Sequence, residues 1–419
     1  MKPLVCQLVP EYLPRLNDRL LAELASTVTA IALTGPRAAG KTTTARRLAR
    51  TVVRLDRDVE ATPFRADPDG VLAVLDPPVL LDEWQAVPGV LAAVKRALDD
   101  GGAGTYLLTG SVRAELIAES WAATGRVIRV AQWGLCEREI AGRADEPSIF
   151  DRLADHGIDA LAADGGDYDL RRYVEVALRG GFPELALRTS APARRRWLAS
   201  YVDQLVLRDS ALQDEDRDPV RFRRYLTAVA ANTAGVVEHK SLYDAAGITR
   251  MTARRYDSLL DMLFVAEQLP AWHSNLLNRL TRSPKRHIVD PALMVPLLGI
   301  DERATLRNGD LLGRVLESFV VSQLRPEIEV AEWQPRLHHL RHESGDREVD
   351  IVAEYPGGRI VAIEVKATSA PQPSDAKHLV WLRDRLGDDF VAGIVLHTGP
   401  RTIRLDDRIA AAPIAVLWR

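Results

Sequence analysis

Two groups of residues in this 419-residue sequence have the types and spacing needed for phosphate chemistry. The first begins with Gly35-x-x-x-x-Gly40-Lys41-Thr42, the spacing of a phosphate-binding loop. Its glycines let backbone N–H groups curl round phosphate oxygens at the start of the next helix. Lys41 is expected to reach the β- and γ-phosphates of ATP, and the Thr42 hydroxyl to bind Mg²⁺. The predicted nucleotide-binding set is Gly35, Pro36, Arg37, Ala38, Ala39, Gly40, Lys41, Thr42, Thr43 and Thr109.

Two acidic residues follow a second apolar run, in the order usual for nucleoside triphosphatases. In "VLLDEWQ", Asp82 is suited to orienting the Mg²⁺ shell and Glu83 to polarising the attacking water. Lys41 and Glu83 are therefore the predicted catalytic residues of this site, and Thr42 and Asp82 its predicted metal ligands. A chance Gly-Lys-Thr sequence and a solvated strand end are the competing interpretations.

Polar residues elsewhere in the same part of the chain extend this set. "YLLTGS" is an apolar run that ends in hydroxyl groups, so Thr109 or Ser111 is expected to sense the γ-phosphate. Arg113 and Arg126 are candidates for neutralising charge in the transition state, and the competing interpretation places each on the surface or in a salt bridge.

The second group is Glu317, Asp350, Glu364 and Lys366, the Asp…Glu-x-Lys pattern of restriction-type nucleases. Alternation along a strand puts Glu364 and Lys366 on one face, and hairpin pairing can bring Asp350 beside them. Glu317, Asp350 and Glu364 are the predicted metal ligands, and Glu364 and Lys366 the predicted catalytic residues. A cross-strand ion pair on a solvated face is the competing interpretation, and cleavage is left open.

The elements around these residues predict an α/β chain with three domains. Apolar runs at 28–34, 51–56, 78–84, 105–111 and 126–133 alternate with helical patterns, which is typical of a parallel sheet covered by helices on both faces. We expect a P-loop ATPase domain at 1–136, a helical region with a winged helix at 137–275, and a mixed α/β nuclease-like domain at 276–419.

The middle region carries a pattern typical of DNA-binding modules. Residues 240–272 read as a helix, a turn at Gly247, a second helix capped by Thr249, and a strand pair. Arg250, Arg254 and Arg255 lie at the start of the second helix, where DNA contacts are made. A purely structural winged helix is the equal alternative. His338, His339 and His342 fit a polar strand end better than a metal site.

Composition limits the class of protein. The formal net charge is −3, so any nucleic-acid contact must be local. The two cysteines, Cys6 and Cys136, are too few for a disulfide framework, which fits a reducing cytoplasm. The first residues are charged throughout and predict neither a signal peptide nor a membrane span.

Taken together, the motifs resemble those of a prokaryotic family in which an AAA-type P-loop ATPase is fused to a C-terminal domain of unknown function. The matching pieces are "GPRAAGKTT", "LLDEWQAVPG", "YLLTGS", "GGFPE", "AAGITRMTARRYDSLL", "HIVDPAL", "GRVLESFV" and "EVDIVAEYPGGRIVAIEVKA". The resemblance implies ATP binding by Lys41, Thr42, Asp82 and Glu83. It also implies a restriction-endonuclease-like set at Glu317, Asp350, Glu364 and Lys366.

The sequence therefore predicts a Mg²⁺-dependent ATPase whose nucleotide state controls a DNA-associated, nuclease-like module. The alternative is a non-hydrolytic nucleotide switch whose degenerate nuclease fold only binds DNA or protein. A small-molecule kinase ranks last, because no acceptor pocket is evident. ATP, Mg²⁺ and DNA are the expected partners, no membrane is expected, and a homo-oligomer is left open.

Overall fold

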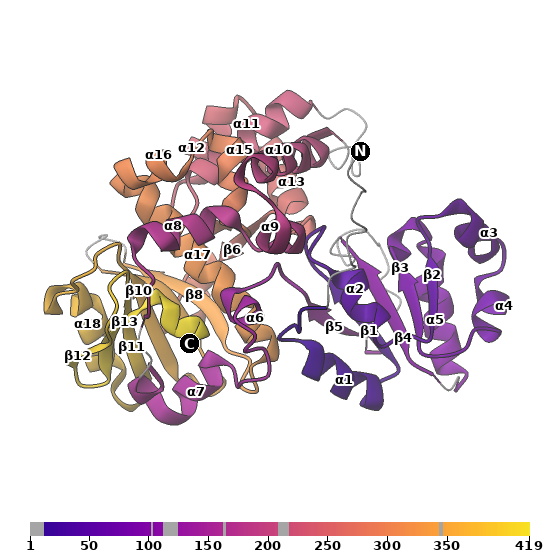
Figure 1. The fold of residues 1–419 in the computed structure, drawn as a ribbon, viewed down its shortest axis with the longest axis horizontal. Coiled ribbons are helices and arrows are strands. Elements are labelled where there is room, and N and C mark those ends of the chain that lie inside the picture. The colour runs from indigo at the N-terminus through magenta and orange to yellow at the C-terminus, as the bar shows by residue number, and fades with distance from the viewer. Residues whose placement is uncertain (1–11, 102–103, 112–124, 162–164, 208–217, 343–346) are drawn as a thin grey trace, which may run out of the picture.

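The computed structural model describes residues 12–101, 104–111, 125–161, 165–207, 218–342 and 347–419. Figure 1 shows an N-terminal region on the right, a helical region above, and a C-terminal region on the left. Strand β5 and helix α6 lie where the N-terminal region meets the other two.

The N-terminal region is built on a parallel five-stranded sheet. The strand order is β2-β3-β4-β1-β5, and every neighbouring pair is parallel. The strands are β1 Ala30–Thr34, β2 Thr51–Arg54, β3 Val79–Asp82, β4 Tyr106–Gly110 and β5 Ile128–Ala131. The helices are α1 Asp18–Thr27, α2 Lys41–Arg46, α3 Asp58–Ala66, α4 Pro68–Ala73 and α5 Gly89–Asp99.

Alternating apolar residues bury both faces of this sheet. Ala30 and Ala32 of β1 pack in one cluster with residues of α3 and α5. Ile31 and Leu33 of the same strand pack in a second cluster with Leu21 of α1. The predicted parallel sheet with helices on both faces is thus confirmed for this region.

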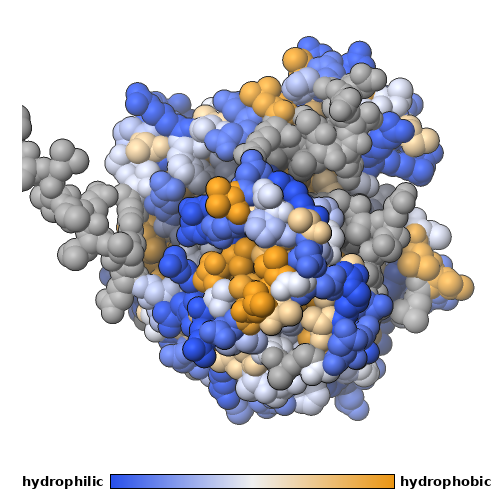
Figure 2. Space-filling model, turned by 90° about the vertical axis from the view of Figure 1, so that its right-hand side faces the viewer, coloured by the Kyte–Doolittle hydropathy of each residue, from blue (hydrophilic) through white to orange (hydrophobic). Residues whose placement is uncertain are grey.

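Figure 2 looks onto the outer side of this region, where α3 and α4 face the viewer in the turned view. An apolar area lies near the centre of that face and is surrounded by hydrophilic groups. Val59 of α3 and Val74, which caps α4, are 88% and 79% exposed.

The helical region follows β5. Its helices are α6 Glu137–Ile140, α7 Ile149–His156, α8 Leu170–Arg179, α9 Pro183–Arg188, α10 Ala191–Leu207, α11 Pro219–Ala231, α12 His239–Ala246, α13 Arg250–Met262, α14 Leu276–Thr281, α15 Met294–Leu298 and α16 Glu302–Arg307. Helix α12 ends at Gly247 in the left-handed conformation, and the Thr249 hydroxyl caps α13 by accepting from the Thr252 N–H at 3.2 Å. Both details match the expected helix-turn-helix.

A short two-stranded sheet follows α13, but its second strand lies further along the chain than expected. Strand β6 Ala266–Leu269 pairs antiparallel with β7 Lys285–Ile288, beyond the predicted range of 240–272. The segment between the strands contains α14, which the sequence reading did not anticipate. All four side chains of β7 are buried, including Lys285, Arg286 and His287.

The C-terminal region contains a mixed six-stranded sheet and the long helix α17 Gly309–Val330. The strand order is β12-β13-β11-β10-β9-β8, with β10, β11 and β13 mutually parallel and the remaining pairs antiparallel. The elements are β8 Arg336–Arg341, β9 Glu348–Glu354, β10 Ile360–Val365, α18 Lys377–Leu386, β11 Phe390–His397, β12 Ile403–Asp406 and β13 Ile409–Pro413. The predicted β9–β10 hairpin is present.

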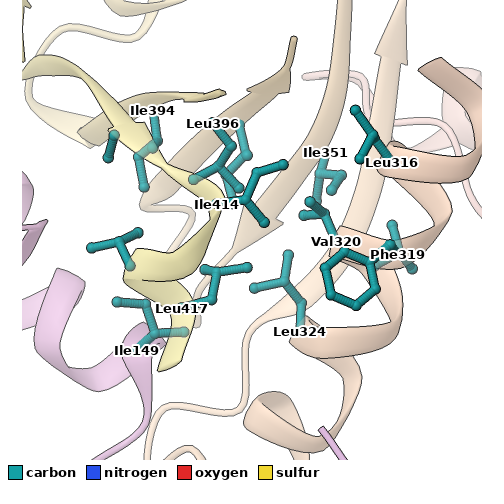
Figure 3. Packing of buried hydrophobic residues seen from close by; sticks show 14 of the residues in the cluster. Ile149, Leu316, Phe319, Val320, Leu324, Ile351, Ile394, Leu396, Ile414 and Leu417 are labelled. Carbon is teal, nitrogen blue, oxygen red and sulfur yellow. The ribbon is translucent and has the colours of Figure 1, made fainter. Parts of the chain in front are cut away.

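Helix α17 packs its apolar face against the C-terminal sheet. Figure 3 shows Leu316, Phe319, Val320 and Leu324 of α17 turned toward Ile351 of β9. The same buried cluster includes residues of α7 and α8, so these two helices share a core with the C-terminal sheet. The expected boundaries at 136/137 and 275/276 stay a prediction.

Candidate nucleotide site and carboxylate cluster

The phosphate-binding loop lies between β1 and α2, at the carboxyl edge of the parallel sheet. Gly35 and Gly40 have φ angles of 147° and 90°, and Ala38 also has a positive φ. A side chain at Gly35 would collide with the carbonyl oxygen of Gln132, so only glycine fits there. Ala39, Thr43 and the other predicted loop residues lie together in this turn and the first turn of α2.

Lys41 is buried within the loop, 6% exposed, and its partners are backbone carbonyls. The Nζ atom donates to Gly35 O at 2.9 Å and to Pro36 O at 2.7 Å. Burial lowers the pKa of Lys41 to about 8, although Glu83 and Asp82 oppose that change. No carboxylate forms a salt bridge with Lys41 among the pairs found in the described chain, so an anionic ligand would find an ammonium already directed into the loop.

Asp82 joins the loop to the neighbouring strand ends. Its Oδ1 atom accepts hydrogen bonds from the Thr42 hydroxyl at 2.7 Å and from the Thr109 hydroxyl at 2.6 Å. The register of β3 and β4 explains this contact, because Asp82 pairs directly with Thr109. The structure therefore brings together the hydroxyl and carboxylate that the sequence predicted as Mg²⁺ ligands.

Glu83 follows Asp82 in the left-handed conformation, with φ 51° and ψ 45°. This strained turn directs its carboxylate to the Gln85 side-chain amide, which donates to Glu83 Oε2. Gly110 lies opposite the turn, and a side chain there would displace the Gln85 amide, whose Oε1 atom would be 2.7 Å from the added Cβ. A non-glycine residue held in this conformation is common at functional sites.

The remaining predictions for this site have mixed outcomes. Ser111 is buried and lies 3.4 Å from the Arg37 Nε atom, which donates to its hydroxyl. Arg126 pairs with Asp99 of α5 at 2.8 Å, which agrees with the competing salt-bridge interpretation. Arg113 and Cys6 lie outside the described residues.

Two residues that were not predicted from the sequence, Arg15 and Gln132, support the loop by hydrogen bonds to its backbone. The buried Arg15 guanidinium donates to Ala39 O at 2.9 Å and to Trp133 O at 2.7 Å, and its Nε atom pairs with Glu139 at 2.9 Å. The Gln132 amide also donates to Ala39 O, at 3.1 Å. These contacts span from 24 to 124 positions, so no local pattern could reveal them.

A cavity of about 300 Å³ adjoins the outer side of the loop. Arg37 and Ala38 form one wall, and α10 forms the other with Trp197, Tyr201 and neighbouring residues. The Trp197 and Tyr201 rings are stacked, with centroids 5.2 Å apart.

The C-terminal acidic set forms a second cluster, and it contains a residue that the sequence reading did not include. Lys285 of β7 places its Nζ atom 2.8 Å from Glu317 Oε1 and 3.3 Å from Asp350 Oδ1. Glu348 lies 3.8 Å from the same ammonium. Its neighbours Arg286 and His287 are also polar, so no pattern in the sequence indicates that this four-residue strand is buried.

Glu364 and Lys366 form the other half of the cluster. Their side chains are 2.9 Å apart, and His378 of α18 lies 3.6 Å from Glu364. The Asp350 carboxylate accepts from the Val365 N–H at 2.9 Å, as the predicted hairpin requires. The competing interpretation was an ion pair on a solvated face. The ion pair between Glu364 and Lys366 is present, but Glu364 is buried.

The charges in this cluster shift the pKa values in opposite directions. Burial, reinforced by Asp350, raises the pKa of Glu317 to about 8 against the effect of Lys285. Burial would also raise the pKa of Asp350, but Lys285 and the Val365 N–H lower it overall. Burial and Asp350 raise the pKa of Glu364. One ammonium therefore cannot neutralise all of the carboxylates.

Comparison with known proteins bears on the region that contains the first of these sites. Residues 27–141 match the family model described as an AAA domain. The N-terminal region is a P-loop ATPase domain. Residues 170–304 and 312–417 match two domains of unknown function, DUF8612 and DUF4143. This P-loop domain therefore precedes two regions whose matches carry no assigned activity.

Two relatives match this chain along most of its length. An uncharacterized protein of Mycobacterium bovis and one of Mycobacterium tuberculosis are each 29% identical over 390 residues, which is 91% of this chain and 79% of the relative. The structure of a Walker-type ATPase of Pyrococcus abyssi is 14% identical, with a TM-score of 0.39 over 67% of this chain and 94% of its own. Among the described residues, no helix has the length and apolar character to cross a membrane.

Proposed function

We propose that the chain is a Mg²⁺-dependent ATPase whose nucleotide state controls a DNA-associated C-terminal region. The observation that carries the ATPase is the hydrogen-bonded set Thr42, Asp82 and Thr109 beside the buried Lys41. Lys41 and the loop N–H groups would hold the phosphates of ATP. Glu83 would position the attacking water by accepting its proton.

Thr42 and Asp82 are the residues that would hold Mg²⁺, since both present oxygen atoms at the end of the loop. The ion supplies charge neutralisation on the phosphate oxygens when it is bound. Because the Thr42 hydroxyl donates its proton to Asp82, its oxygen lone pairs remain available to the ion.

The test of ATP turnover uses two variants and one control. Lys41→Ala is expected to lose binding and turnover, because the loop loses its only ammonium. Glu83→Gln should bind ATP within about threefold of wild type and hydrolyse it at least about a hundredfold more slowly. Lys95→Ala, on the exposed side of α5, should leave both unchanged. Equal turnover by wild type and Lys41→Ala would contradict the proposal.

Contacts along α17 support the control of the C-terminal region by nucleotide. Glu329 accepts from the Ala131 N–H at 2.6 Å, and Gln323 accepts from the Glu137 N–H at 2.7 Å. The same 131–139 segment supports the phosphate loop through Gln132. Glu317 lies on the same helix, 12 residues or about 18 Å before Glu329. A shift of the loop would therefore reach the C-terminal cluster through one continuous helix, α17.

The DNA association rests on the exposed start of α13. Arg250, Arg254 and Arg255 are exposed there, in the helix that follows the turn at Gly247. Fluorescence anisotropy with duplex DNA tests this role: Arg250→Ala/Arg254→Ala should weaken binding at least tenfold, with a salt slope reduced by about two. Arg171→Ala/Arg303→Ala, a change of equal charge elsewhere on the helical region, should have little effect. Equal binding by both double variants would contradict the assignment to α13.

The alternative is that the C-terminal fold binds DNA or protein without cleaving it. The salt bridges of Lys285 to the carboxylates favour this alternative over a nuclease. Incubation of plasmid with Mg²⁺ or Mn²⁺ separates the two: cleavage that is lost in Asp350→Ala supports a nuclease, and intact plasmid supports the alternative.

A further inference from the structure

Lys285 is buried more completely than any other lysine or arginine in the described chain, at 1% exposure. It comes from β7 of the helical region, whereas its acidic partners come from α17 and β9 of the C-terminal region. Pairing with β6 fixes the path of β7, and an isolated bridge between Arg286 and Gly235 adds a second support. The ammonium is therefore placed among the carboxylates by backbone structure.

The position of this ammonium conflicts with the metal site that the sequence predicts. Glu317 and Asp350 both direct oxygen atoms at Lys285 Nζ, at 2.8 and 3.3 Å, so a positive charge already lies between them. Adding a divalent cation would bring it against an ammonium of like sign in a buried environment. With the side chains as they lie around Lys285, the described residues contain no group of three or more His, Cys, Asp or Glu side chains arranged to hold a metal ion.

The acidic set nevertheless keeps features of a cation site. Glu364 is 3% exposed, and its Oε1 atom accepts no hydrogen bond within the described structure. Glu348 is 38% exposed and lies at the edge of the cluster, so small ions can approach from solvent. Removal of the Lys285 ammonium would leave the buried carboxylates of Glu317 and Asp350 without their shared counter-ion. Glu364 would keep Lys366 at 2.9 Å.

We propose that Lys285 is the built-in cation of this carboxylate cluster. In the intact chain its ammonium fastens β7 to α17 and β9, and the cluster does not bind a divalent metal. A metal site made of Glu317, Asp350 and Glu364 is latent, and it opens only when Lys285 is withdrawn or removed. This inference does not depend on ATP binding.

Manganese binding in the absence of nucleotide tests the proposal, with free Mn²⁺ measured by electron paramagnetic resonance. The wild-type chain is expected to show no Mn²⁺ site that depends on Asp350. Lys285→Ala should gain one site per chain, at least tenfold tighter than any wild-type binding, and Lys285→Ala/Asp350→Asn should lose it. Lys366→Ala removes a lysine from the same cluster but leaves Lys285 in place, so it should gain nothing.

Two results would overturn the proposal. One is wild-type Mn²⁺ binding that Asp350→Asn abolishes, because the metal would then displace or coexist with Lys285. The other is a folded Lys285→Ala chain that gains no site. If circular dichroism shows that the alanine variant is unfolded, Lys285→Met keeps the length of the side chain and replaces it in the same experiment. The first result needs only the wild-type chain and Asp350→Asn, so it can be decided even if every Lys285 variant is unfolded.

Discussion

The two charged sites of this chain both combine a buried lysine with acidic residues. Their lysines differ in what they contact: backbone carbonyls in the first site and carboxylates in the second. Lys41 donates to the carbonyls of Gly35 and Pro36, while the nearby Asp82 accepts from two hydroxyl groups. Lys285 instead contacts Glu317 and Asp350 directly. In the first site the ammonium donates to carbonyls and forms no salt bridge among the described residues, which suits it to an incoming anion. In the second site the lysine already forms salt bridges with Glu317 and Asp350. We therefore expect this site to have a structural role in the wild-type chain.

Replacing each lysine by methionine should show the largest difference. Lys285→Met leaves Glu317 and Asp350 buried without a counter-ion, which should cost about 3–5 kcal/mol. Lys41→Met removes a poorly compensated buried charge, so the change should be within about 1 kcal/mol or stabilising. Urea unfolding followed by circular dichroism measures both. Lys377→Met, on the exposed start of α18, is the control, and equal destabilisation by the two buried-site variants would remove the contrast.

Loss of Arg15 should produce the next largest effect, because Arg15 donates to the phosphate loop at Ala39 O and also pairs with the buried Glu139. Arg15→Met removes the bonds to Ala39 O and Trp133 O, so the loop becomes less ordered and the affinity for ATP should fall about tenfold. Calorimetric titration measures the affinity, and Arg19→Met on exposed α1 provides a matched control. Plasmid or DNA binding altered as strongly as ATP binding would mean that Arg15 does not act on the loop alone.

The pH dependence of ATP affinity should report the ammonium of Lys41. Its pKa is lowered to about 8 by burial, and bound phosphate favours the charged form, so binding takes up a proton near that pH. Affinity should therefore be lost progressively as pH rises through 8, measured from about pH 7.5 to 9.5, where the charge of ATP is constant. Lys41→Arg keeps its charge over this range, and a folded Lys41→Arg chain with the same decline would contradict the assignment to Lys41.

A smaller pH effect, on the stability of the fold, is expected from a carboxyl group of the second cluster. Because the pKa of folded Glu317 is raised to about 8, the folded chain binds more protons than the unfolded chain between about pH 4.5 and 8. Its contribution to stability is full below that window and is lost as pH rises through it. The urea midpoint of wild type should fall more steeply from pH 6 to 9 than that of Glu317→Gln. Parallel curves would show that Glu317 does not titrate in this range.

How much could be predicted from the sequence differs between these sites for a physical reason. The phosphate loop is contiguous, and its glycines and Lys41 carry their geometry within eight residues. Asp82 was also predictable, since it ends an apolar run that must become a buried strand. The β9–β10 hairpin likewise followed from alternation and from the turn at 356–358.

What could not be predicted depends on contacts between distant segments. Arg15 meets Glu139 across 124 positions, and Lys285 meets Asp350 across 65. Neither residue belongs to a local pattern, and each would read as an ordinary surface charge. The partner strand of β6 was misplaced for the same reason, because strand pairing across α14 leaves no short-range signal.

Counting bound Mn²⁺ on the wild-type chain, with and without a non-hydrolysable ATP analogue, tests the contrast between the two sites most directly. The expected result is one Mn²⁺ per chain, present only with the nucleotide and lost in Asp82→Asn but not in Asp350→Asn. A Mn²⁺ ion that binds without nucleotide and disappears in Asp350→Asn would contradict it, as would the absence of any bound ion when the nucleotide is present.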